Sequence, residues 1–369
     1  MAGNAGLGVV RVAGASLLCA ALSAYGVTVN IDPSERHQVV DGFGAFGQCN
    51  RYANTSYTTF LHDDLGVTMV RLQVPHDWEL SNDNTDPNSL NLSGYNIAGN
   101  FQRWKTVVDG MKRYSDVRFV ASIWTPPAWM KDLSRDPSPT CSDGAGACGG
   151  PLRADMRAEL AEYLYAFYRA MQQECGVDLY GISLQNESAF IEWYVSCVYD
   201  PDEYRDALKA LGAKFEAEGV NCILFGAEDM LGNITVNPYF GLMNVDPVAK
   251  GYIGAAAVHG YTNGVDPLPT STGSQAWTRL GTVMRGLGAR AWMTETSGFP
   301  ESWTGAMTIA GNIALAMRYA DLSAWVFWSD AESNGSASEY ALLSNFQHTQ
   351  RSYASKMFYK FVRPGGVRI

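Results

Sequence analysis

Residues 179–226 contain a complete strand–helix–strand unit, and this unit decides the fold class. The short apolar runs LYGISL (179–184) and CILFG (222–226) flank a helical stretch that begins at DPDE (200–203). In DPDE, Asp200 can accept from free amides, Pro201 needs no donor in the first turn, and Glu203 can return the bond. Short apolar strands that alternate with longer helical patterns are typical of a parallel sheet with crossover helices.

The same alternation continues along the chain and predicts eight strands. They are expected at residues 43–49, 67–73, 117–123, 179–184, 222–226, 256–261, 291–295 and 324–328. Eight such units close most economically into a (β/α)8 TIM barrel, because crossovers are right-handed and a closed sheet has no edge. The alternative is an open, doubly wound sheet. However, the glycines of DGFGAFG (41–47) lie within a strand rather than at a helix start, which disfavours a dinucleotide site.

Composition excludes several other classes of protein. The 369 residues are 47% hydrophobic and 17% charged, which suits a large buried core and excludes a disordered chain. The formal net charge of −10 disfavours a nucleic-acid partner, because phosphate binding needs concentrated Lys and Arg. After position 30 there is no purely apolar stretch of about 18 residues, so no membrane span is expected.

Both ends of the chain carry features outside the predicted barrel of residues 41–363. In residues 1–26, Arg11 precedes the small apolar run Val12–Ala24, a rough match to a signal peptide. We therefore expect a secreted or periplasmic protein, with a disordered leader as the alternative. Residues 27–40 include one further short strand that has no obvious partner inside the barrel.

Cysteine usage agrees with export. Removing the leader would leave six of the seven cysteines, an even count that suits an oxidising compartment. Cys141 and Cys148 bracket a short flexible loop, which either closes as a disulfide or holds two free thiols. No Cys-x-x-Cys pair or His-rich segment accompanies them, so no metal site and no cofactor are expected.

Two glutamates are the leading candidates for catalysis. Reactive groups of a parallel barrel lie at the carboxyl ends of its strands. Glu187 and Glu295 both follow or end a predicted strand, as do Asp77, Asp330 and the main competitor, Glu228. Paired carboxylates across a cleft permit glycoside hydrolysis, because one can donate a proton while the other attacks the anomeric carbon. For either glutamate alone, a structural ion pair is the alternative.

Tryptophans also gather just beyond the predicted strand ends. Trp124 and Trp129 belong to the proline-stiffened run WTPPAWMK (124–131), whereas Trp193, Trp303 and Trp328 lie on other rim segments. Such a cluster favours a cleft in which sugar faces stack on indoles. Core packing is the alternative for any single tryptophan.

Five motifs in sequence order resemble glycoside hydrolase family 30. They are VDGFGAF (40–46), WTPPAWMK (124–131), SLQNE (183–187), WMTE (292–295) and FYKFVRPG (358–365). The resemblance implies a retaining β-glycosidase with Glu187 as the acid/base and Glu295 as the nucleophile.

The resemblance also implies roles for residues around this pair. Asn186 would bind the sugar hydroxyl next to the reacting carbon, and Arg71 would lie beside Glu295 and keep it ionised. Tyr261 would donate to the nucleophile. His259 would line the subsite, with a buried core histidine as the alternative.

Two features depart from the pattern of the family. Ser188 stands where proline is usual. Members of the family carry a side β-sandwich, which this chain would largely lack, with residues 27–40 and 364–369 as its remnants.

The expected partner is a β-linked oligo- or polysaccharide. The segment 193–199 is similar to the xylan-cleaving branch, so an endo-acting hydrolase of the xylan or β-1,6-glucan type is favoured. A glucosylceramidase or β-glucosidase type of exo enzyme and a non-catalytic carbohydrate-binding barrel remain alternatives. A lyase or aldolase is disfavoured, because no lysine stands at a strand end.

Overall fold

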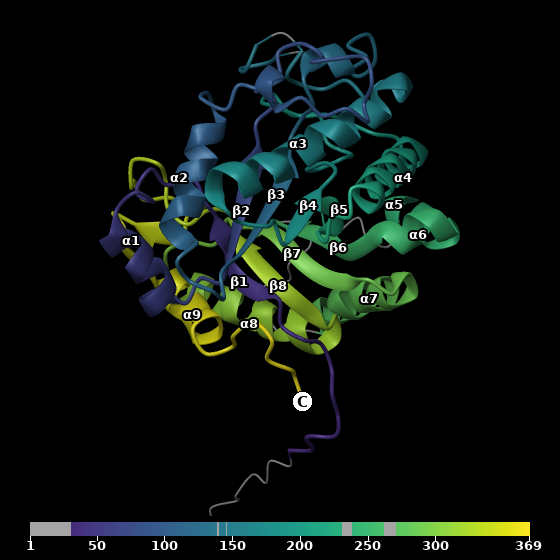
Figure 1. Ribbon diagram of the computed structural model, residues 1–369. Helices are drawn as coiled ribbons and strands as arrows, with labels where there is room; N and C mark the ends of the chain where they lie inside the picture. Colours follow the sequence, from purple (N-terminus) through teal and green to yellow (C-terminus); the bar gives the residue numbers. More distant parts are fainter. Residues whose placement is uncertain (1–30, 139, 145, 231–237, 262–270) are drawn as a thin grey trace, which may run out of the picture. The chain divides into compact units, whose positions relative to one another are not determined.

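The barrel predicted from the sequence is present and closed. The structure, a computed structural model, describes residues 31–369 except 139, 145, 231–237, 262–270 and the side chains of 271–273. Its larger compact unit is Arg36–Arg368. Within this unit, β1 (Gly42–Phe46) pairs in parallel with both β2 (Met69–Val74) and β8 (Leu322–Phe327) (Figure 1). Because the first and last strands pair, the (β/α)8 fold is confirmed and the open sheet is excluded.

The remaining barrel strands lie close to their predicted positions. They are β3 (Arg118–Ile123), β4 (Gly181–Ser183), β5 (Ile223–Met230), β6 (Ile253–Gly260) and β7 (Arg290–Thr296). The clearest difference is at β5, which the sequence analysis ended at Gly226. The strand continues because its register against β6 shifts between Ala227 and Asp229, and the irregular part carries Glu228 with φ 52°.

Helices surround the barrel, and the helix after β4 begins at the residues that the sequence predicts. The described helices are α1 (Thr55–Thr59), α2 (Phe101–Met111), α3 (Arg157–Cys175), α4 (Pro201–Ala217), α5 (Pro238–Val245), α6 (Pro247–Tyr252), α7 (Ser271–Leu287), α8 (Trp303–Tyr319) and α9 (Gln350–Tyr359). At α4 the amide of Asp200 donates to the Glu203 carboxylate at 3.0 Å, as the capping box predicts. Gly176 ends α3 at φ 68°, a left-handed conformation that favours glycine.

Side chains close the amino-terminal end of the barrel. Trp292 and Phe225 pack there with ring centroids 5.2 Å apart, and the small Ala255 and Ala257 belong to the same buried cluster. The Trp292 indole donates to Asp41 at 2.8 Å. This end is a packed core, so the space for a substrate is at the carboxyl ends of the strands.

The two ends of the barrel-forming segment lie side by side. Val39 forms an antiparallel bridge with Val367, and the amide of His37 donates to the carbonyl of Arg368 at 2.8 Å. The predicted leader (1–26) and residues 27–30 of the predicted strand lie outside the described residues. The proposed remnants of a side β-sandwich therefore stay a prediction.

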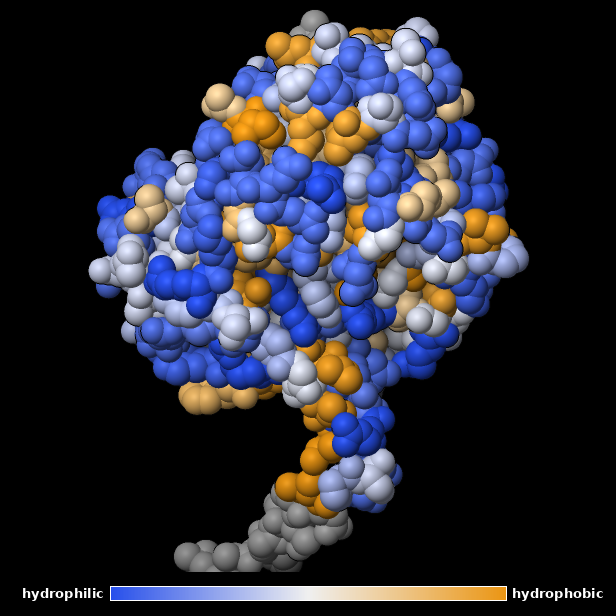
Figure 2. Space-filling view, in the orientation of Figure 1, coloured by the Kyte–Doolittle hydropathy of each residue, from blue (hydrophilic) through white to orange (hydrophobic). Residues whose placement is uncertain are grey.

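Cysteine pairing and the surface complete the description. Cys141 and Cys148 form a disulfide with a Cα–Cα distance of 5.5 Å, which settles the alternative left open by the sequence. None of the described helices is long and apolar enough to cross a bilayer. The face in Figure 2 is largely hydrophilic, with apolar side chains in separate small patches.

Candidate active site

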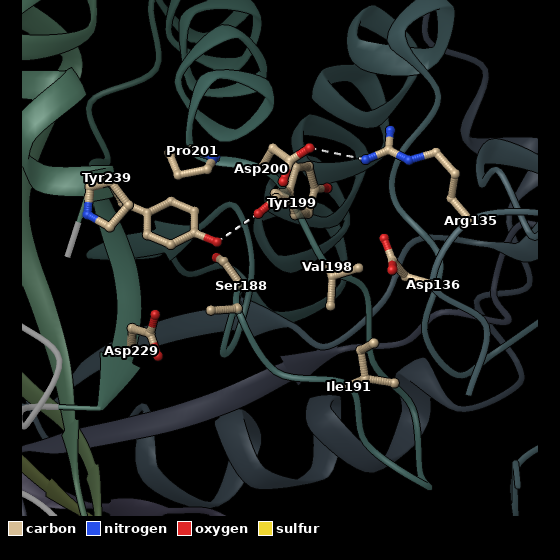
Figure 3. A pocket seen from close by; sticks show the side chains of 12 residues that line it. Arg135, Asp136, Ser188, Ile191, Val198, Tyr199, Asp200, Pro201, Asp229 and Tyr239 are labelled. Carbon is tan, nitrogen blue, oxygen red and sulfur yellow. Dashed lines mark hydrogen bonds and ion pairs between the residues drawn. The ribbon is translucent and has the colours of Figure 1, made fainter. Parts of the chain in front are cut away.

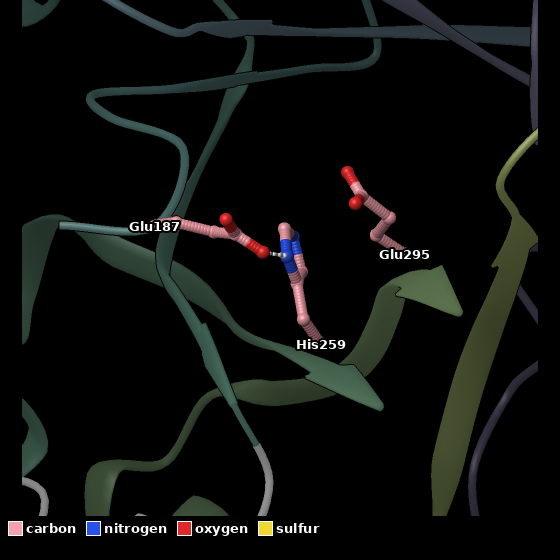
Figure 4. Close-up of side chains that lie close together, drawn as sticks. All are labelled: Glu187, His259 and Glu295. Atoms are coloured by element: carbon pink, nitrogen blue, oxygen red, sulfur yellow. Dashed lines mark hydrogen bonds and ion pairs between the residues drawn. The ribbon is translucent and has the colours of Figure 1, made fainter. Parts of the chain in front are cut away.

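Glu187 and Glu295 face each other at the carboxyl end of the barrel. Glu187 follows β4 and Glu295 lies near the end of β7, and both are more than nine-tenths buried. One oxygen of each carboxylate and one nitrogen of His259 all lie within 4.8 Å of one another (Figure 4). The fold thus brings two carboxylates that are far apart in the chain into one site.

Glu295 is held by a cation and a hydroxyl. Arg71, from β2, donates to its Oε2 at 2.5 Å, and the Tyr261 hydroxyl donates to its Oε1. Burial and the charge of Glu295 raise the pKa of Tyr261 well above its usual value, so the phenol stays protonated as a donor. These two contacts fix the position of the carboxylate.

Glu187 is oriented by a histidine. Its Oε1 lies 2.9 Å from His259 Nδ1, and its backbone adopts φ 49°, a conformation that non-glycine residues seldom adopt. Burial lowers the pKa of His259, but the charge of Glu295 and the contacts with Glu187 and Glu228 outweigh it and raise the pKa to about 10. The imidazole is therefore a cation that donates to Glu187. It lies fully buried, at the side of the acid rather than on the cleft surface.

Glu228, the main competitor in the sequence, lies behind the catalytic pair. It is fully buried and accepts from Arg71 at 2.9 Å and from Ser122 at 3.1 Å. Burial raises its pKa, but the Arg71 charge outweighs this effect and the net pKa is lowered. Glu228 therefore serves as a permanent counter-charge for Arg71.

Asn186 is fixed by the same arginine. Its Oδ1 accepts from Arg71 at 2.7 Å, so its amide nitrogen is left as the donor group. The Arg71 guanidinium also lies over the Trp124 ring, 4.6 Å from its centroid. One buried arginine therefore positions a carboxylate, an amide and an indole.

An aromatic cleft of about 660 Å³ opens above Glu295. Its aromatic lining residues are Phe46, Trp124, Trp193, Tyr194, Tyr261, Trp328 and Tyr340. Trp124, Trp193, Tyr261 and Trp328 were predicted from the sequence. Trp129 lies elsewhere, because its indole donates to the Glu79 carbonyl at 3.2 Å and it lines a separate pocket of about 330 Å³.

The sequence analysis missed several residues of the cleft. It also missed Glu192, which precedes the cleft residue Trp193 in the chain; it is buried, and burial together with the nearby Glu187 charge raises its pKa to about 7. Its position next to Trp193, five residues after Glu187, was the available clue. Phe46 and Tyr340 gave no such clue, because only the closure of β1 against β8 brings their segments to the cleft.

Glu187, His259 and Glu295 also have the residue types of a metal site. However, His259 Nδ1 is already in hydrogen-bond contact with Glu187 Oε1 at 2.9 Å, and Glu295 is engaged by Arg71 and Tyr261. The geometry suits an acid and a nucleophile better than a metal. The expectation of no metal and no cofactor stays a prediction.

Comparisons with known proteins agree with this geometry. No protein-family model matches the chain. The chain is 26% identical over 362 residues to the glucuronoxylanase XynC of Bacillus subtilis, an alignment that covers 94% of this chain and 72% of that protein. It is 23% identical over 331 residues to an endo-1,6-β-D-glucanase of Neurospora crassa, covering 84% and 64%.

A solved structure supports the fold. The catalytic domain of the family 30 xylanase C from Talaromyces cellulolyticus superposes with a TM-score of 0.70 at 22% identity, covering 92% of this chain and 79% of that one. Together with the sequence relatives, this similarity confirms the predicted resemblance and the predicted barrel.

Proposed function

We propose that this chain, a glycoside hydrolase homologous to family 30 enzymes, cleaves a β-linked polysaccharide internally with retention of anomeric configuration. The observation that carries the proposal is the approach of Glu187 and Glu295 to within 4.8 Å. Retaining enzymes hold their two carboxyl groups about 5–5.5 Å apart, whereas inverting enzymes need about 6.5–9.5 Å to admit a water molecule. The spacing supports direct attack on the sugar.

In the proposed reaction Glu187 protonates the glycosidic oxygen while Glu295 attacks the anomeric carbon. The result is a covalent glycosyl-enzyme, after which Glu187 removes a proton from the incoming water. Arg71 and Tyr261 hold the Glu295 carboxylate in position for the attack. The amide of Asn186 is free to donate to a sugar hydroxyl, because Arg71 occupies its oxygen.

The proposed substrate is a polysaccharide of the xylan or β-1,6-glucan type. This proposal is supported by the activities of the two relatives, a glucuronoxylanase and an endo-1,6-β-D-glucanase, and by the aromatic cleft. An exo-acting glucosylceramidase type is less well supported by these relatives. A non-catalytic carbohydrate-binding barrel is disfavoured, because it would not need two carboxylates at attack distance.

We also propose that the protein is exported to a secreted or periplasmic location. The disulfide between Cys141 and Cys148 supports this, because disulfides persist mainly in oxidising compartments. Mass measurement of the protein recovered outside the cytoplasm tests it, and an intact N-terminus on a cytoplasmic protein would contradict it.

The decisive experiment follows the stereochemistry of the product. Purified protein is incubated with glucuronoxylan, β-1,6-glucan and β-linked nitrophenyl glycosides, and proton NMR records the first anomer released. We expect oligosaccharide products of β configuration. An initial α product would contradict the retaining mechanism, and the release of single sugars alone would contradict internal cleavage.

A further inference from the structure

The segment of residues 188–199, which follows Glu187, separates two cavities. On one side Trp193, Tyr194 and Val195 line the aromatic cleft. On the other side is a second cavity of about 470 Å³ (Figure 3), to which this segment contributes Ser188, Ala189, Ile191, Val198 and Tyr199. Cys197 and Tyr199 pack into the core, whereas Phe190, Ile191 and Trp193 are exposed, so the middle of the segment has little side-chain packing to fix its position. Its backbone must be held by other contacts.

The loop closed by the disulfide supplies those contacts. The Trp193 carbonyl accepts from the amide of Ser142 at 2.9 Å, and Cys148 Sγ lies 3.6 Å from the same oxygen. The amide of Ser196 donates to the Ala147 carbonyl at 3.0 Å. These backbone hydrogen bonds fix the segment at Trp193 and at Ser196, on both sides of Tyr194 and Val195.

The hydroxyl of Ser196 connects the two parts further. It accepts from the amide of Gly149 at 3.0 Å and from the amide of Glu192 at 3.1 Å. Lys131 Nζ donates to the Ser196 carbonyl at 2.9 Å, so both polar groups of this residue are engaged. Ser196 therefore ties the disulfide loop to the residues that flank Trp193.

Trp193 itself is not held by burial. Its exposed fraction is 62%, although it lines the cleft, and its ring meets Tyr194 edge to face with centroids 5.4 Å apart. An exposed indole offers one face to a sugar ring at low entropic cost only if its backbone is already fixed. The disulfide loop provides that fixed backbone.

We propose that the disulfide loop of residues 141–148 positions Trp193 as a sugar-binding platform and so determines how tightly a long glycan binds. The proposal rests on the proposed function. Glu187 and Glu295 are oriented instead by His259, Arg71 and Tyr261. The loop therefore acts on substrate binding and leaves the bond-breaking step unchanged.

The first test replaces both cysteines, in Cys141→Ser/Cys148→Ser. We expect KM for polysaccharide to rise about fivefold to tenfold, in line with loss of a stacking contact, with kcat within about twofold. Turnover of a short nitrophenyl glycoside stays at the wild-type value. The matched control is Cys222→Ser, which alters a free, half-buried cysteine and leaves both substrates unaffected. An unchanged KM, or an equal fall of kcat on both substrates, would overturn the proposal.

A second test asks whether the effect passes through Trp193. We expect Trp193→Ala to raise KM by a similar factor, and the cysteine substitutions to add nothing in that background. Ser196→Ala, which keeps the disulfide, is expected to raise KM in the same direction. Fully additive effects of the tryptophan and cysteine changes would contradict the positioning role.

Affinity electrophoresis in gels containing the polysaccharide separates this inference from the proposed function. A wild-type protein that is retarded but releases no product would contradict the proposed function alone. Equal retardation of the wild type and the cysteine variant would contradict the positioning role alone.

Discussion

The two ends of the barrel both bury carboxylates, but their hydrogen-bonding environments differ. At the amino-terminal end, Asp41 accepts from four side chains: Trp292 at 2.8 Å, Ser323 at 2.6 Å, Tyr180 at 2.5 Å and Arg118 at 3.1 Å. Each oxygen of this single carboxylate thus has two donors.

At the carboxyl end, Glu187, Glu228 and Glu295 share two cations, Arg71 and His259. These carboxylates have fewer donors per oxygen than Asp41, and Glu228 Oε2 has no hydrogen-bond partner among the described residues. Fully satisfied polar networks hold a fold together, whereas perturbed and incompletely neutralised groups are typical of functional sites. The comparison teaches that the number of donors per carboxylate, rather than burial alone, distinguishes the reactive end from the structural end.

The strongest test of this difference between the two ends is to remove the proposed nucleophile, Glu295. We expect Glu295→Ala to reduce kcat by about 10⁴-fold or more, because no other described carboxylate can attack from its position. The midpoint of unfolding should change little, because Arg71 keeps Glu228 as its counter-charge. Steady-state kinetics and urea unfolding measure the two effects, and a variant that keeps a tenth of the activity would refute the assignment.

Removing the acid should have a smaller effect that depends on the substrate. Glu187→Ala is expected to lower kcat on polysaccharide by about 10²–10⁴-fold, because proton donation to the leaving oxygen is lost. Nitrophenyl glycosides with good leaving groups need less protonation, so their cleavage should be partly preserved. Equal losses on both kinds of substrate would argue against the acid role.

The buried histidine at the carboxyl end predicts a pH dependence of stability. The pKa of His259 is raised from 6.5 to about 10, so between these values the folded state binds more protons than the unfolded state. Its contribution is complete below pH 6.5 and is lost as pH rises through 10.

Urea unfolding of the wild type and His259→Gln at pH 6.5 and pH 10 measures this contribution. We expect the wild type to lose more stability than the variant over this interval. Parallel losses would show that the neighbouring Glu187, Glu228 and Glu295 do not hold His259 protonated.

At the amino-terminal end of the barrel, we expect a substitution to reduce stability and leave catalysis unchanged. We expect Asp41→Asn to reduce the free energy of unfolding by about 2 kcal/mol, because one oxygen that accepts two hydrogen bonds becomes a donor group. The kcat per folded molecule should stay at the wild-type value. If Asp41→Asn lost kcat without losing stability, the amino-terminal end could not be called structural and the carboxyl end reactive.

Much of the fold and of the catalytic pair could be predicted from the sequence. Strand positions follow from local apolar runs, and the DPDE start of α4 is set by the hydrogen-bonding groups of its own residues. Glu187 and Glu295 were found because each stands at the end of such a run. The extension of β5 could not be predicted, because it depends on a register shift against β6 rather than on the β5 sequence.

The surroundings of Glu187 and Glu295 were harder to predict from the sequence. Asp41 and Glu228 are both acidic residues beside predicted strands, yet one closes the structural end and the other neutralises Arg71. Trp129 and Trp124 share one motif, but only Trp124 lines the aromatic cleft. Sequence patterns give the end of a strand, whereas the direction of each side chain depends on residues from other strands.

The sequence by itself determined the eight strand–helix units, the helix caps and two carboxylates at strand ends, because local residue order encodes each of these features. Tertiary structure decided which carboxylate meets which cation and that Cys141 and Cys148 pair. It also decided that the disulfide loop forms hydrogen bonds with the backbone on both sides of Tyr194 and Val195. The physical reason is that the contacts of the carboxylates and of the disulfide loop join residues distant in the chain, which the folded barrel brings within hydrogen-bonding distance. Cys141 and Cys148 are only seven residues apart, but their pairing depends on a loop conformation that sets their Cα atoms 5.5 Å apart.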